Sequence, residues 1–244
     1  PAEGEEPAEA EKPWTGKLEF GAFFTDGNTR RRGGHAAFTA RKEWEKSRFT
    51  GKALANYADE YGVRSANEQF VSLREDMKMD PWYVFALLTG ERDEFERIDC
   101  RAILALGAGR NLADDPGFKL DVELGPTATY INYKNVDDKH RENKDGEIKD
   151  EYKDWEDEDS KYEVGFRIAF HAEIAVFESA KITEDLEIFP SLIYGGEFRA
   201  VSETAFEQPL SEAWYFKLSV IDRYNSLAAE GTKKNDVEVL VSLV

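Results

Sequence analysis

The strongest constraint on this fold is a strict alternation of apolar and polar residues that persists over unusually long stretches. It is clearest within residues 160–177, where every second position is apolar: Tyr162, Val164, Phe166, Ile168, Phe170, Ala172, Ile174 and Val176. Successive side chains of a strand point to opposite faces, so one face of this segment is continuously apolar. Soluble strands have about 5–6 residues, whereas a strand tilted at about 45° needs roughly 9–11 to cross a bilayer. The alternation therefore predicts strands that cross a membrane.

The same alternation extends from Trp14 to the end of the chain. We predict twelve strands, at about 15–25, 30–45, 48–60, 65–79, 82–94, 97–110, 117–133, 160–177, 180–190, 196–207, 213–224 and 235–244. No run of 18 apolar residues occurs, which excludes a transmembrane helix. The expected fold is all-β: a closed, antiparallel, up-and-down transmembrane β-barrel over residues 15–244.

Short and long connections alternate along this strand pattern. Asp80-Pro81 is a short turn, Leu112 to Pro116 forms another, and the connection at 134–159 is the longest. Outer-membrane barrels have short periplasmic turns and longer external loops, and an even strand count places both termini in the periplasm. The chain begins without signal-peptide features, which fits a mature protein whose signal has been removed and equally fits a cytosolic protein. We expect a monomeric barrel in the lipid of a bacterial outer membrane.

The net charge of −18 is unevenly distributed. Residues 1–13 carry five glutamates and one lysine, and residues 134–159 carry twelve acidic and six basic side chains. Such segments cannot bury a core, so we predict an acidic periplasmic tail at 1–14 and an extended external loop at 134–159. The charge argues against nucleic acid as a partner. In a pore the loop would concentrate cations at the mouth. In a docking module, residues 1–13 and 134–159 would contact other envelope proteins.

The polar face of the predicted strands is rich in charge. The charged residues expected to line the lumen are Glu19, Arg74, Asp99, Arg101, Asp121, Glu123, Glu163, Arg167, Glu173, Arg199, Glu203, Lys217 and Arg223. A twelve-stranded lumen is narrow, so acids and bases should pair across strands. Two readings remain open: a barrel plugged by ion pairs, and a small polar pore.

Two of the short turns are followed by similar aromatic pairs. Trp82-Tyr83 and Trp214-Tyr215 each open a predicted strand. Tryptophan and tyrosine favour the membrane interface because one end of each ring is apolar and the other polar. We predict that these four residues form an aromatic girdle at the turn end, with an ordinary aromatic core pair as the alternative.

No pattern in the chain indicates catalysis. There is one cysteine, Cys100, and the three histidines show no metal-ligand spacing. His171 shares a face with Glu173, but no serine carries a nucleophile motif, so a structural, hydrogen-bonded histidine is favoured. We predict no catalytic residues, no metal, no cofactor and no enzymatic activity.

The loop at 134–159 partly matches a calcium-binding template. Asn143, Asp145 and Gly146 occupy three of its positions. Arg141 and Tyr152 occupy the first and last ligand positions, where the template requires acids. A solvated acidic loop is the favoured interpretation.

Several short segments resemble a known family in their order and spacing. These are Phe24-Thr25-Asp26-Gly27-Asn28-Thr29, Asp80-Pro81-Trp82-Tyr83-Val84-Phe85, Gly90-Glu91-Arg92-Asp93-Glu94-Phe95, Leu106-Gly107-Ala108-Gly109-Arg110, Leu124-Gly125-Pro126 and Asp185-Leu186-Glu187-Ile188-Phe189-Pro190. The chain resembles the YdiY-like domain of unknown function, described as salt-induced outer-membrane proteins, over about residues 15–244. The resemblance implies an outer-membrane barrel and supplies no reaction or ligand. One departure is the non-aromatic end, Val241-Ser242-Leu243-Val244.

Three functions follow from these patterns. The first is a non-enzymatic outer-membrane barrel with a charged, salt-bridged lumen, either structural or a narrow passive pore. The second is an interaction module that docks envelope proteins through its acidic tail and loop. A third is a soluble lipid-carrying barrel, whose interior would be apolar and whose exterior would be polar.

Overall fold

The computed structural model describes residues 13–26, 31–60, 63–94, 96–134, 160–177, 179–226, 228 and 233–244. These residues form twelve strands: β1 (Thr15–Asp26), β2 (Arg31–Glu43), β3 (Ser47–Glu60), β4 (Val63–Met79), β5 (Trp82–Asp93), β6 (Ile98–Asp115), β7 (Phe118–Tyr133), β8 (Lys161–Val176), β9 (Ala180–Pro190), β10 (Phe198–Pro209), β11 (Tyr215–Asn225) and β12 (Asn235–Leu243). Within the described ranges, no helix is long and apolar enough to cross a membrane. The acidic tail at 1–12 and the connection at 135–159 lie outside the described residues.

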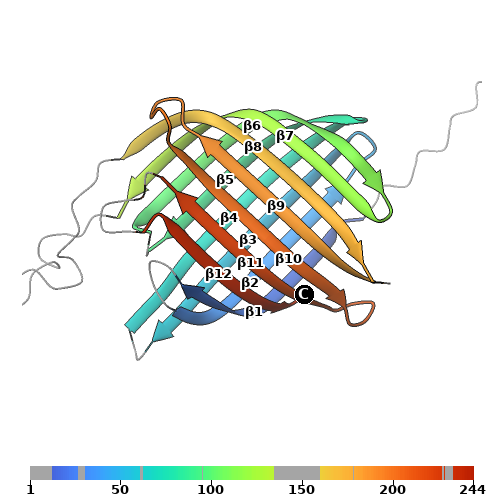
Figure 1. Ribbon diagram of the computed structural model, residues 1–244, viewed down its shortest axis with the longest axis horizontal. Coiled ribbons are helices and arrows are strands. Elements are labelled where there is room, and N and C mark those ends of the chain that lie inside the picture. The colour runs from blue at the N-terminus through green and yellow to red at the C-terminus, as the bar shows by residue number, and fades with distance from the viewer. Residues whose placement is uncertain are drawn as a thin grey trace, which may run out of the picture.

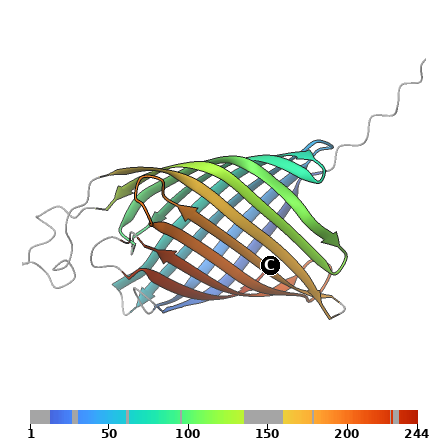
Figure 2. The same cartoon turned by 45° about the horizontal axis from the view of Figure 1, so that its top comes forward.

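The strands form one closed antiparallel barrel. Each strand pairs with its neighbours in sequence, and β1 pairs with β12 to close the ring, with Phe20 opposite Leu243. The strands run obliquely around the wall (Figure 1), and the same tilt is visible after rotation (Figure 2). The predicted fold class and the predicted count of strands are confirmed over the described part of the chain.

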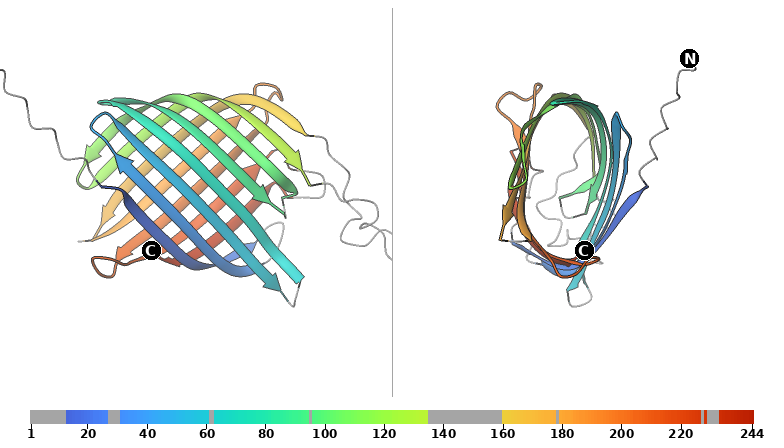
Figure 3. Two further views of the ribbon diagram at one scale, coloured as in Figure 1. Left: turned by 180° about the vertical axis from the view of Figure 1, so that it is seen from behind. Right: turned by 90° about the vertical axis from the view of Figure 1, so that its right-hand side faces the viewer.

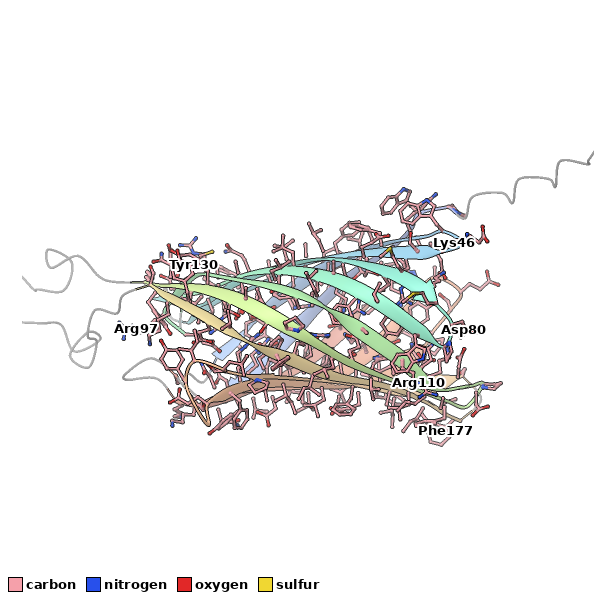
Figure 4. The ribbon with its side chains drawn as sticks, turned by 90° about the horizontal axis from the view of Figure 1, so that it is seen from above. Lys46, Asp80, Arg97, Arg110, Tyr130 and Phe177 are labelled. Carbon is pink, nitrogen blue, oxygen red and sulfur yellow. The ribbon has the colours of Figure 1, made fainter. Side chains whose placement is uncertain are left out.

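The two ends of the barrel differ in their connections. At one end, here called the turn end, short links join β2 to β3, β4 to β5, β6 to β7, β8 to β9 and β10 to β11. The opposite end, the loop end, carries the connection that begins after Tyr133. In Figure 4, Lys46, Asp80 and Phe177 lie at the turn end, whereas Arg97 and Tyr130 lie at the loop end. The first residue of β1 and the last of β12 are both at the turn end.

One strand is longer than the alternation indicated. β6 continues to Asp115, so most of the segment predicted as a turn at 112–116 is strand. The β6–β7 register shifts between Asn111 and Ala113. This irregularity interrupts the period-two pattern and made the strand seem to end early.

The wall is apolar outside and polar inside. Phe166, Phe170 and Leu124 are 38%, 40% and 57% exposed on the outer face, although they belong to regular strands. Arg101 and Arg167 are each only 4% exposed because they point into the barrel. This polarity suits a barrel surrounded by lipid and is the reverse of what a soluble lipid carrier requires.

Aromatic rings border the apolar band at both ends. At the turn end, Trp82 and Trp214 are 50% and 51% exposed. At the loop end, Tyr130 packs against Tyr162 at 5.0 Å between ring centroids, and Phe198 against Tyr224 at 5.2 Å.

The girdle prediction was wrong for Tyr83 and Tyr215. Tyr83, on β5, donates a hydrogen bond to Glu123 on β7 at 2.7 Å, which is possible only inside the barrel. The ring of Tyr215, on β11, lies 5.5 Å from Lys17 Nζ on β1, a contact that bypasses β12. Adjacent residues of a strand face opposite sides, so a tyrosine directly after an outward tryptophan must point inward.

Seen along its axis, the barrel is oval (right side of Figure 3). Opposite walls are therefore closer along the short diameter than a circular cross-section would allow. This shape brings side chains from non-neighbouring strands within contact distance.

Candidate functional site: the charged lumen

Ion pairs between non-neighbouring strands show that the charged residues meet inside the barrel. Arg74 on β4 contacts Glu123 on β7 at 2.5 Å, although β5 and β6 lie between these strands in the wall. Arg223 on β11 contacts Glu68 on β4 at 3.3 Å, from the opposite wall. Such pairs cannot form around the outside of a closed barrel.

The first group of lumen charges, the Glu123 cluster, consists of Arg48, Arg74, Asp76, Tyr83, Glu123, Arg167 and Glu187. Arg74 donates two hydrogen bonds to the Glu123 carboxylate, at 3.1 and 2.5 Å. Arg167 donates to the same carboxylate and also to Glu187 at 2.5 Å. Glu123 thus accepts four donors when the Tyr83 hydroxyl is included. Charge-assisted hydrogen bonds of this kind are stronger than neutral ones.

Two arginines of the Glu123 cluster lie over the aromatic rings of Tyr83 and Phe85. The guanidinium carbons of Arg74 and Arg167 are 4.8 and 5.4 Å from the centroid of the Phe85 ring. Tyr83 and Phe85 in turn lie flat on β6, because glycines stand opposite them there. A Cβ at Gly109 would lie 2.2 Å from the Tyr83 ring. The position of the Tyr83 ring therefore depends on the absence of a side chain at Gly109.

The second group, the vestibule cluster, lies toward the loop end and consists of Glu68, Glu91, Glu96, Arg101, Arg199, Arg223 and Glu238. Arg101 contacts Glu91 at 2.9 Å and Glu96 at 3.7 Å. Arg199 on β10 contacts Glu91 on β5 at 3.9 Å. Together with the Arg223–Glu68 pair, this contact bridges the lumen from wall to wall.

The Glu96 carboxyl lies in the short link between β5 and β6. Burial raises its pKa, although the neighbouring Arg101 opposes this effect. Burial therefore disfavours the charged form of this carboxyl relative to that of an exposed one.

A chain of polar contacts joins β11 to β4 through the lumen. Lys217 contacts Glu19 at 3.5 Å, and Glu19 lies 3.6 Å from the ring of His35. His35 shares a 2.7 Å hydrogen bond with Asn56, and Asn56 donates to Glu68 at 2.7 Å. The buried His35 is thus hydrogen-bonded through Nδ1 to Asn56, and its Nε2 faces Glu19 without a hydrogen bond to it.

At the turn end, the charged groups are more exposed. Glu173 contacts Lys119 at 3.3 Å and Lys181 at 3.0 Å. His171 forms a 2.6 Å hydrogen bond with Asp185 on the neighbouring strand. This geometry fits the predicted structural role of His171, and the described residues place no serine among its hydrogen-bond partners.

Twelve of the thirteen charged residues expected in the lumen lie on the inward face of their strands. The prediction was wrong for Asp99. Its carboxylate lies 3.7 Å from Arg92, on the outer face, and both side chains are 47% exposed. The cause is a register shift between Ile98 and Cys100, which reverses the alternation locally.

Several inward-facing acidic residues were not among those predicted from the sequence. Glu68 and Asp76 share the inward face of β4 with Arg74, and Glu91 shares that of β5 with Tyr83. Glu187 and Glu238 belong to inward faces of β9 and β12. The signal that could have identified them was the alternation itself, applied to every strand.

Two adjoining cavities open in the vestibule. The first is lined by Glu91, Glu96, Ile98, Arg101, Tyr133, Arg199, Val201, Arg223, Tyr224, Asn225, Ala228, Lys233, Lys234 and Asp236. The second shares Arg101, Tyr133, Arg199 and Asn225 with it and adds Glu163 and Phe189. Within the described residues, no group of acidic, histidine or cysteine side chains is arranged to hold a metal ion.

A closed barrel with an apolar outer band, aromatic borders and a charged interior defines a class: the outer-membrane β-barrels. The chain also matches the model of a protein family of unknown function, DUF481, over residues 18–244. The chain belongs to this family, which confirms the resemblance seen in its motifs.

Three solved porin structures are similar to this chain, and one of them supports the fold. The NanC porin superimposes with a TM-score of 0.53 at 9% sequence identity, covering 93% of this chain and 100% of that one. A KdgM porin in complex with disordered oligogalacturonate gives a TM-score of 0.48 at 8% identity, with 94% and 97% covered. An anion-selective porin from Comamonas acidovorans gives 0.41 at 8%, with 95% and 99% covered. Only the first is similar enough to support the fold. No curated protein matches the chain in sequence.

Proposed function

We propose that this protein is a narrow, passive, non-enzymatic pore for small polar solutes in a bacterial outer membrane, with both termini on the periplasmic side. The observation that carries the proposal is that charged side chains inside the barrel remain in contact with solvent. Arg74, Lys217 and Glu187 have exposed side-chain fractions of 18%, 17% and 35%, although all three point inward. Charged groups on β4, β9 and β11 therefore keep surface that water can contact inside the lumen.

The ion pairs that cross the lumen would set the width of such a pore. Arg199 and Arg223 extend from β10 and β11 toward acids on β5 and β4. Each crossing pair occupies part of the short diameter of the oval. The remaining passage would admit ions and small polar molecules and exclude larger solutes.

Single-channel recording in planar lipid bilayers tests this proposal. The variant Glu68→Gln/Arg223→Ala removes one crossing pair, and the glutamine amide oxygen can still accept the hydrogen bond that Asn56 donates to Glu68. We expect a higher conductance than in the natural protein. The matched control is Arg92→Ala/Asp99→Ala, which removes an acid–base pair from the outer face and should leave the conductance unchanged.

The alternative of a plugged, structural barrel predicts a different result. In that case, neither the natural protein nor the Glu68→Gln/Arg223→Ala variant would conduct, although both are folded. Folding is checked independently by the shift in electrophoretic mobility that intact barrels show before boiling.

A further inference from the structure

We propose that the vestibule at the loop end of the lumen is a binding site for small carboxylate-bearing anions. The inference deepens the proposed function, since the site lies in the same lumen, but binding does not require that the pore conduct. It rests on three observations: the local excess of basic groups, the position of Arg199, and the aromatic rings beside it.

The first cavity of the vestibule has the opposite charge balance from the chain as a whole. The protein carries a net charge of −18. The lining of the first cavity nevertheless contains five basic side chains, Arg101, Arg199, Arg223, Lys233 and Lys234, against the three acids Glu91, Glu96 and Asp236. In a recess of low dielectric constant, such an excess attracts anions more strongly than it would on an open surface.

Arg199 is the residue best placed to hold an anion. Its guanidinium carbon stacks on the Phe189 ring at 4.5 Å from the centroid. Its acidic contact, Glu91, is 3.9 Å away and forms a closer pair, at 2.9 Å, with Arg101. Stacking fixes the plane of the guanidinium group, and its N–H donors point outward within that plane. A planar donor edge of this kind matches the two oxygens of a carboxylate.

Arg101 adds a second charge at the same place. Arg101 and Arg199 line both cavities, so a ligand lying where the cavities meet can contact both. Arg101 is 4% exposed and is held by Glu91 and Glu96. Its position is therefore fixed before any ligand arrives, which lowers the entropic cost of binding.

The surroundings favour a singly charged organic anion. Glu163 and Glu197 also line the second cavity and would repel a dianion such as hydrogen phosphate more strongly than a monoanion. The rings of Tyr133 and Phe189 offer apolar contact to the carbon part of a ligand. A carboxylate on a small polar carbon skeleton satisfies both conditions.

The test uses the full-length folded protein in detergent micelles and ligand-observed NMR, with gluconate as the probe and glucose as its neutral counterpart. We expect line broadening of gluconate and none of glucose. Arg199→Gln should weaken gluconate binding by about tenfold, the effect of losing one charge-assisted hydrogen bond. Arg199→Lys should bind gluconate more weakly than the natural protein and more tightly than Arg199→Gln, because lysine keeps the charge but lacks the planar pair of donors.

The matched control is Lys17→Gln. Lys17 is also a cation on an aromatic ring, since its Nζ lies 5.5 Å from the Tyr215 centroid, but it contacts a residue at the turn end. This variant should bind gluconate as the natural protein does. Equal broadening of glucose and gluconate, unchanged binding by folded Arg199→Gln, or equal loss in Lys17→Gln would overturn the site. Tighter binding of inorganic phosphate than of gluconate would overturn the carboxylate class.

The outcome is separate from that of the conductance experiment. Binding of gluconate by a barrel that does not conduct would refute the pore and leave the site intact. Conductance without gluconate binding would refute the site and leave the pore intact.

Discussion

Replacing Glu123 by glutamine should destabilise the barrel more than any comparable change at the rim. The Glu123 carboxylate accepts hydrogen bonds from Arg74, Tyr83 and Arg167, and its side chain is only 10% exposed. In Glu123→Gln the amide NH2 group replaces one of the two acceptor oxygens and faces guanidinium donors. The two arginines then lose the negative charge they share.

The expected loss of stability depends on which acids still pair with Arg74 and Arg167 after Glu123 is replaced. Breaking a buried ion pair costs about 3–5 kcal/mol. Arg74 keeps Asp76 at 2.7 Å and Arg167 keeps Glu187 at 2.5 Å, so neither is left alone. Water also reaches Arg74, whose side chain is 18% exposed. We therefore expect the low end of the range, about 3 kcal/mol.

Urea-induced unfolding of the protein refolded in lipid vesicles, followed by tryptophan fluorescence, measures this loss. With a slope of about 3 kcal/mol per molar urea, the midpoint should fall by about 1 M. The control is Glu173→Gln, where the acid is 27% exposed and pairs with Lys119 and Lys181. A pair of this kind is worth less than about 1 kcal/mol.

A double-mutant cycle with Arg74→Gln separates the pair from the rest of the cluster. The two changes should be non-additive by about 0.5–3 kcal/mol, because the partners are in direct contact. If Glu123→Gln costs no more than Glu173→Gln, or if the two changes add without coupling, the Glu123 cluster does not stabilise the barrel in the way described.

Two further predictions concern the wall. Gly109→Ala should displace the Tyr83 ring and lower the free energy of unfolding by about 1–3 kcal/mol in the same assay. The control is Gly34→Ala, where nothing lies within 4 Å of the added carbon, and it should change the free energy of unfolding by less than about 0.5 kcal/mol. Equal costs would contradict the proposed packing. Cys100 is exposed and pairs with Asn132 near the loop end, so a water-soluble maleimide should label it on intact cells. Labelling only after the outer membrane is opened would mean that the loop end faces the periplasm.

The alternation of apolar and polar residues was sufficient to predict the fold because a membrane barrel repeats one rule in every strand. The same rule placed Arg74, Arg101 and Arg167 correctly. The rule failed where a β-bulge interrupts the alternation of side chains along a strand. The bulge beside Cys100 turns Asp99 outward, and no residue type at 98–100 announces that bulge.

The partners inside the lumen could not be predicted from the alternation. Which strands face each other depends on how the barrel closes and flattens, and both follow from the register of all the strands together. The contact of Arg223 with Glu68 joins residues 155 positions apart. Sequence alone indicated that Arg223 points inward but not that its acid would come from β4.

The net charge of the chain is a poor guide to the selectivity of its lumen. Residues 1–13 and 134–159 together carry ten of the eighteen net negative charges, and nearly all of these residues lie outside the described strands. The first cavity of the vestibule, toward the loop end, is lined by more basic than acidic groups. The acidic connection should draw cations toward the mouth, whereas Arg101 and Arg199 should hold anions inside it.

Deleting 137–159 would then lower cation preference in bi-ionic recordings and strengthen gluconate binding, because a negative field that repels the anion is removed. The deletion and Arg199→Gln should therefore shift selectivity in opposite directions, and a shift in the same direction would mean that one electrostatic element, not two, controls the pore.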